Sequence, residues 1–116
     1  MEAGAARVVL VTTPDVGSAR TIARAVVEER LAACGNIVPG LTSIYRWQGT
    51  LEEAAETLLI LKTSDDRLAA LRARVVELHP YDVPEVLALR IDAGHQPYLD
   101  WLGECLREPG GENDGT

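Results

Sequence analysis

The chain has 116 residues, 47% of them hydrophobic and 25% charged, and its formal net charge is −7. This length and composition are typical of one globular domain with a core of its own, and they exclude a chain that is disordered throughout. The acidic balance argues against a nucleic-acid-binding surface, because such surfaces need clustered Lys and Arg side chains.

The start of the chain and its cysteines indicate a compartment. Residues 1–11 contain neither a basic leader nor a long apolar segment, so we expect no signal peptide, no membrane span and a cytoplasmic protein. Cys34 and Cys105 form neither a disulfide framework nor a zinc-ligand spacing. We therefore expect two reduced, buried thiols, and the alternative is one disulfide between them.

The chain opens with a predicted strand and a predicted helix. Residues 7–13 (RVVLVTT) form a short β-branched apolar run, which is typical of a strand buried on both faces. Residues 16–34 place apolar side chains at helical spacing after Asp15. Gly35 is positioned to end this helix in a left-handed turn.

A hairpin is predicted next. Residues 41–47 and residues 56–63 read as two strands, joined through a tight turn in which Gly49 takes a positive φ. Alternation along the first of these strands places its Ser43, Tyr45 and Trp47 side chains on one side.

The second half of the chain predicts two helices around a fourth strand. The polar residues 64–66 are placed to cap a helix that Pro80 stops, because the residue before a proline avoids helical geometry. Residues 85–91 predict the strand, and Pro97 opens a short helix over residues 98–106. The buried stripe of the first of these helices is expected to be Leu68, Leu71, Val75 and Leu78, and one side of the second carries Tyr98, Trp101, Leu102 and Cys105.

The order β-α-β-β-α-β with a C-terminal helix predicts an α+β, ferredoxin-like domain with a four-stranded antiparallel sheet. We place this single domain at residues 7–107 and expect a disordered acidic tail at residues 108–116, which lack apolar side chains. Two helices cover only one face of such a sheet, yet the residue run 58–61 is apolar on both faces. Self-association would cover the second face.

The segment ELHPYDVPEV, residues 77–86, holds the densest group of candidate site residues. His79 is a candidate metal ligand or proton carrier, and the alternative is a cap on the preceding helix. Tyr81 stands between the two prolines of the segment. Glu85 begins a predicted strand, where acids are disfavoured, and is therefore a candidate site residue.

Three candidates lie on the predicted hairpin. Lys62 either extends its amine to solvent or offers an anion site in a cleft. Tyr45 and Trp47 either pack across a subunit interface or line a pocket. The sequence contains no GxSxG, HExxH or glycine-rich phosphate loop. We therefore interpret the chain as a binding domain and set aside an enzyme that uses His79 and Glu85 for proton transfer.

Three long segments carry a resemblance to a known family. They are ERLAACGNIVPGLTSIYRWQGTLEEAAETLLILKT, HPYDVPEVLALRI and YLDWL. Together they resemble the CutA family of divalent-cation tolerance proteins over residues 8–106.

The resemblance implies a ferredoxin-like protomer in a PII-like homotrimer, with ligands held in clefts between subunits. It implies His79 as a metal ligand, and Tyr45, Trp47, Lys62, Tyr81 and Glu85 as residues of the ligand cleft. Copper or zinc would bind weakly, with no obligatory cofactor, since Thr12, Thr13 and Leu78 stand where some members carry a cysteine or a second histidine. The alternative function is a PII-like signalling or adaptor trimer that binds a metabolite or a partner protein.

Overall fold

A computed structural model describes residues 1–108 of the chain. The predicted acidic tail lies outside these residues except for Glu108. The elements, after a short 3-10 turn η1 (Ala3–Ala5), are β1 (Ala6–Thr13), α1 (Val16–Glu28), β2 (Cys34–Trp47), β3 (Thr50–Ser64), α2 (Leu68–Leu78), β4 (Val86–Arg90) and α3 (Gln96–Leu106). This order confirms the predicted α+β, ferredoxin-like fold.

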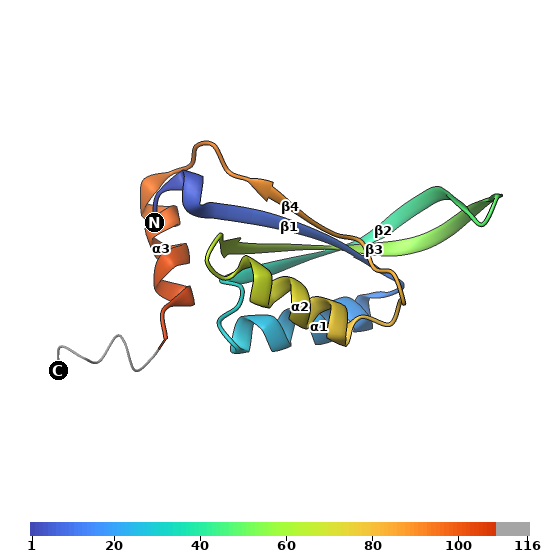
Figure 1. Ribbon diagram of the computed structural model, residues 1–116, viewed down its shortest axis with the longest axis horizontal. Helices are drawn as coiled ribbons and strands as arrows, with labels where there is room; N and C mark the ends of the chain where they lie inside the picture. Colours follow the sequence, from blue (N-terminus) through green and yellow to red (C-terminus); the bar gives the residue numbers. More distant parts are fainter. Residues whose placement is uncertain (109–116) are drawn as a thin grey trace.

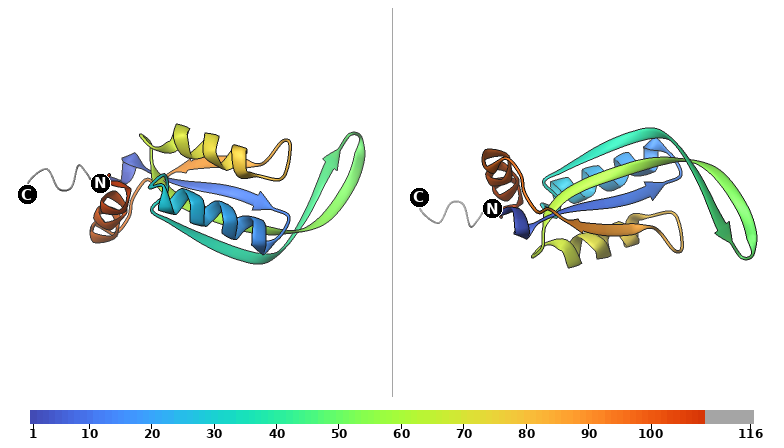
Figure 2. Two further views of the ribbon diagram at one scale, coloured as in Figure 1. Left: turned by 90° about the horizontal axis from the view of Figure 1, so that it is seen from below. Right: turned by 90° about the horizontal axis from the view of Figure 1, so that it is seen from above.

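The four strands form one sheet in the order β2-β3-β1-β4, and each neighbouring pair is antiparallel. Helices α1 and α2 lie side by side on one face of this sheet, and α3 crosses its end (Figure 1). Seen from the other side, the strands lie in front of both helices (Figure 2). The far half of the β2–β3 hairpin projects beyond the sheet as an arm.

The main core lies between the sheet and the two helices. Strand alternation directs Val9 and Val11 of β1, with Leu59 and Leu61 of β3, toward the helices, where all four are fully buried. Ile22 and Val26 of α1 and Leu71 and Val75 of α2 meet them. Neighbouring residues of β1 on its other face are only half-buried, so a single chain does not bury this strand on both faces as predicted.

The end of α1 differs from the prediction. The helix ends at Glu28, and the left-handed residue is Arg30 with φ 60°, not Gly35. The Arg30 amide donates to the Val27 carbonyl (3.1 Å) and the Leu31 amide to the Val26 carbonyl (2.9 Å), the two bonds of a Schellman motif. Arg30 also donates from its guanidinium to the Cys105 carbonyl (3.2 Å), a contact that holds it in this turn.

Gly35 instead lies in β2, against the helix that it was predicted to end. A Cβ atom at this position would come within 3.0 Å of the Leu61 side chain and 3.3 Å of Ala23. The glycine therefore lets α1 approach the sheet closely.

The hairpin is longer than predicted. Its strands begin at Cys34 and Thr50, not at residues 41 and 56, with an irregularity between Val38 and Leu41 where Gly40 takes φ 87°. In the turn both Gln48 and Gly49 have positive φ, 50° and 81°, which confirms the predicted role of Gly49.

The helix boundaries near the candidate site are partly as predicted. Within residues 1–108, no side chain caps the start of α2, because Ser64 donates to Asp66 instead. Its end is confirmed, since His79 has extended backbone geometry before Pro80. Glu85 precedes β4 and does not belong to it. In α3 the buried residues are Leu99, Leu102 and Leu106, whereas Tyr98 and Trp101 are 43% and 46% exposed.

The second face of the sheet is apolar and is covered by no helix of residues 1–108 (Figures 1 and 2). Register places Val8, Leu10, Leu58 and Ile60 there, half-buried. Leu87 and Leu89 of the edge strand β4 lie beside them and are 55% and 52% exposed. We call this surface the open face. In the same part of the chain, no helix has the length and apolar character needed to span a membrane.

Candidate functional site

His79 is nearly buried at the junction of α2 and the following loop, with 8% of its surface exposed. Its Nε2 lies 2.7 Å from the Thr12 carbonyl oxygen, and the Tyr81 amide donates to Nδ1 at 3.0 Å. A carbonyl only accepts and an amide N–H only donates, so the ring carries its proton on Nε2. Both ring nitrogens therefore have partners within the chain. The predicted helix cap is not formed, because the ring bonds the end of β1.

Tyr81 connects His79 to the hairpin. Its ring lies 4.8 Å from that of His79 between centroids, and its hydroxyl donates to Oε2 of Glu56 at 2.7 Å. Burial, followed by the hydrogen bond to Glu56, raises the pKa of Tyr81 to about 12. The phenol thus keeps its proton at neutral pH and acts as a hydrogen-bond donor.

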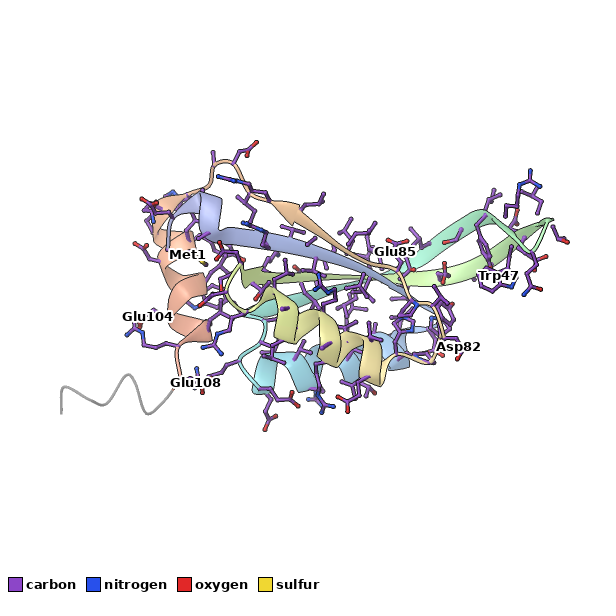
Figure 3. All side chains as sticks on the ribbon, in the orientation of Figure 1. Met1, Trp47, Asp82, Glu85, Glu104 and Glu108 are labelled. Atoms are coloured by element: carbon purple, nitrogen blue, oxygen red, sulfur yellow. The ribbon has the colours of Figure 1, made fainter. Side chains whose placement is uncertain are left out.

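A cleft of about 740 Å³ opens between this loop and the arm. Figure 3 shows Trp47 on the arm, and Asp82 and Glu85 on the loop near the base of the arm. The cleft is lined by Thr12, Ser43, Ile44, Tyr45, Trp47, Glu56, Pro80, Tyr81, Asp82, Val83 and Glu85.

The lining of this cleft is aromatic and acidic. Tyr45, Trp47 and Tyr81 are 43%, 52% and 37% exposed, high values for such large rings. Glu56, Asp82 and Glu85 supply carboxylates, and none of the lining residues named above is Lys or Arg. The site is therefore suited to cations and disfavours anions.

The structure separates one predicted cleft residue from the others. Lys62 lies on the open face, where it is the strand partner of Cys34 in β2 and of Val8 in β1. Thr57, the partner of Thr13 at the cleft end of β3, is five residues away along the strand. That separation is roughly 17 Å at the rise of a strand. The Lys62 amine donates to the Asn36 side chain at 2.5 Å. Within one chain, Lys62 and the cleft are thus separate features, and His79 lies behind Tyr81 without lining the cleft.

Sequence patterns did not identify two ionisable residues of the cleft, Glu56 and Asp82. Glu56 contacts Tyr81 across 25 positions of sequence, so no local pattern indicates the pair. Asp82 lies inside the segment 77–86, between the two prolines, and that position was the only available signal. In the part of the chain that the structure describes, no three His, Cys, Asp or Glu side chains are arranged to hold one metal ion.

The two cysteines lie at the other end of the sheet, and both are free thiols that are half-buried, not buried as predicted. Cys34 starts β2 and its Sγ is 3.8 Å from the Tyr98 hydroxyl. Burial, and then the neighbouring Cys34, raises the pKa of the Cys105 thiol. This thiol therefore stays protonated at neutral pH and is a poor metal ligand.

The chain is thus a ferredoxin-like domain with a projecting hairpin arm and an acidic, aromatic cleft at the base of that arm. A family model, CutA1 divalent ion tolerance protein, matches residues 7–105. The chain belongs to this family.

Individual relatives agree with the family match. The divalent-cation tolerance protein CutA of Thermus thermophilus is 61% identical over 97 residues, which are 84% of this chain and 94% of that protein. A CutA protein of rice, named chloroplastic, is 48% identical over 101 residues, 87% of this chain but 57% of that protein. The crystal structure of CutA from Xylella fastidiosa superposes with a TM-score of 0.86 at 39% identity, covering 88% of this chain and 98% of that one.

Proposed function

We propose that this protein is a homotrimer of the cation-tolerance type that binds cations in the cleft between the arm and the 80–85 loop. The observation that carries the proposal is the charge of the cleft. Three carboxylates line it, those of Glu56, Asp82 and Glu85, and the whole chain carries a net charge of −7. Such a concave acidic surface raises the local concentration of cations.

Divalent ions such as copper or zinc fit this cleft only as weakly bound, exchangeable ligands. Carboxylates are acceptable donors for both ions, but tight binding requires several donors at one point. One chain brings no such set together within residues 1–108. Additional donors would come from water or from a neighbouring subunit. His79 as a direct ligand stays a prediction, and it would require the loss of one of its two hydrogen bonds.

The open face supports the trimer. On this face Leu87 and Leu89 of β4 each expose about half of their surface. They lie beside four half-buried apolar residues of β1 and β3. Soluble monomers rarely leave a contiguous apolar surface of this kind in water. Packing of open faces around a threefold axis would bury it and would bring the arms and clefts of different subunits together.

Metal titration by calorimetry tests the proposed site. We expect Zn²⁺ and Cu²⁺ to bind the wild type weakly, and the double variant Glu56→Gln, Glu85→Gln to bind at least about tenfold more weakly. Glu104→Gln, on α3 at the opposite end of the molecule (Figure 3), is the matched control and should bind as the wild type. Equal binding by all three proteins would exclude the cleft as the cation site.

The aromatic walls favour a second candidate, a PII-like signalling trimer whose cleft holds an organic metabolite. Three exposed rings are more than a bare metal ion needs, and pockets for organic ligands are lined in this way. In both cases we propose a binding protein and not an enzyme. We also propose a cytoplasmic location, and fractionation of the cells that make the protein would test it.

A further inference from the structure

The cleft combines aromatic rings with carboxylates in a way that a bare metal ion does not use. Tyr45 and Trp47 extend from β2 on the arm, and Tyr81 approaches from the loop that follows α2. Each ring leaves a third to a half of its surface exposed. The faces of such rings carry negative electrostatic potential and attract cations placed over them.

The carboxylates of the cleft come from different parts of the chain. Glu56 comes from β3, and Asp82 and Glu85 come from two positions of the loop. Within the described residues they do not form a group of three that could meet on one ion. A divalent metal ion needs oxygen donors at about 2.0–2.6 Å on several sides, and carboxylates that do not form such a group do not provide them.

An organic cation has neither requirement. Its charge is spread over N–H or N-methyl groups several ångströms apart, so each can face a different carboxylate or ring. A cleft of about 740 Å³ also lies within the range of roughly 300–1,000 Å³ found for small-molecule sites.

We propose that the ligand of this cleft is an organic ammonium ion, held over Trp47, Tyr45 and Tyr81 and neutralised by Glu56, Asp82 and Glu85. This inference rests on the proposed cation-binding cleft and names the class of cation that it takes. The site is ordered before the ligand arrives, because Tyr81 is held by Glu56 on one side and by His79 on the other. Pre-ordering of this kind lowers the entropic cost of binding.

The two tryptophans of the chain allow a direct test. Trp101 lies on α3, is 46% exposed and is absent from the cleft lining. In the variant Trp101→Leu, Trp47 is the only remaining indole, and its fluorescence reports on the cleft alone. The probes are spermidine, with several ammonium groups, choline, with one quaternary ammonium, and 3,3-dimethylbutanol, the neutral shape analogue of choline.

We expect spermidine, choline or both to change the Trp47 fluorescence saturably, while 3,3-dimethylbutanol binds at least about tenfold more weakly. Binding of one amine alone identifies the source, a polyamine or a quaternary ammonium, and supports the proposal. Calorimetry on otherwise wild-type protein should show Trp47→Leu and Glu85→Gln each weakening the bound amine by about five- to tenfold. Trp101→Leu, the matched aromatic control, should leave the affinity unchanged.

Other outcomes overturn the inference. If both amines bind no better than the neutral analogue while Zn²⁺ still perturbs Trp47, the cleft takes metal ions and the inference fails, although the proposed function stands. If neither the amines nor Zn²⁺ bind, both fail. If Trp101→Leu weakens amine binding as strongly as Trp47→Leu does, the amine binds elsewhere and the inference is wrong.

Discussion

At the scale of single residues, the segment 77–86 joins the core to the cleft. His79 fixes the end of β1 to the start of the loop through the Thr12 carbonyl, and the loop returns a hydrogen bond from the Tyr81 amide. Tyr81 in turn contacts Glu56 on β3. The histidine that sequence reasoning offered as a metal ligand thus has a structural position that the sequence could not reveal.

Replacing His79 tests this position. His79→Phe keeps an aromatic ring but leaves the Thr12 carbonyl and the Tyr81 amide without their partner in a nearly buried site. We expect the free energy of unfolding in urea to fall by about 1–3 kcal/mol. The exposed His95 provides the control, and His95→Asn should stay within about 0.5 kcal/mol of wild type. Equal stabilities of the two variants would contradict this role for His79.

Tyr81 predicts a dependence of stability on alkaline pH. Its pKa rises from 10.0 to about 12 on folding, so the folded chain binds the proton more tightly than the unfolded chain. The contribution of the protonated Tyr81 phenol to the free energy of unfolding is therefore complete below pH 10 and is lost as the pH rises toward 12. Denaturant unfolding of wild type and Tyr81→Phe should show the wild type losing more stability across this window. Parallel losses would show that the phenol titrates normally.

At the scale of elements, sequence patterns located every strand and helix but misplaced several ends. The apolar spacing of α1 and the prolines around β4 and α3 are local signals, and they were sufficient. The end of α1 was missed because the left-handed residue after it is Arg30, whereas sequence patterns assign that geometry to glycine. The outer part of the arm was missed because residues 51–55 are exposed or half-buried and show no strand alternation.

Gly35 gives a test at this scale. Gly35→Val would place methyl groups where Leu61 and Ala23 already stand, in the contact between α1 and the sheet. We expect a loss of stability of about 1–3 kcal/mol, measured by thermal or urea unfolding. Gly17→Ala, where an added Cβ meets only the Asp15 side chain at 3.5 Å, is the matched control and should not destabilise the protein. A wild-type stability for Gly35→Val would refute the close approach.

The candidate site shows the same division between local and distant signals. Tyr45, Trp47, Tyr81 and Glu85 were predicted as cleft residues, and the structure brings these four together. The place of Glu56 in the cleft and the distance of Lys62 from it were not predictable from the sequence. Both depend on the register between neighbouring strands.

At the scale of the whole molecule, the open face is the surface that the proposed trimer would bury. The α1 and α2 layer leaves this face uncovered (Figure 2), and the residues at its centre are apolar. A chain of this size that buries only one face of its sheet gains further apolar burial by association.

A charge on this face should prevent association. Leu87→Glu together with Leu89→Glu places two carboxylates on the edge of the open face. We expect sedimentation to show the mass of one chain for this variant and of three chains for the wild type. Val76→Glu, on α2 and 46% exposed, adds a charge on the helix side and should retain the wild-type mass. A single-chain mass for the wild type would refute the trimer.

The two hydrogen bonds of the His79 ring, to the Thr12 carbonyl and from the Tyr81 amide, have a kinetic consequence. Because these bonds join the loop to the folded core, opening this wall of the cleft would break two hydrogen bonds and expose the buried imidazole. Ligands would then meet a surface that is already formed, so their association rate should be limited by diffusion and by attraction to the acidic cleft, and should fall steeply with ionic strength. Differences in affinity between cations would consequently lie in their dissociation rates.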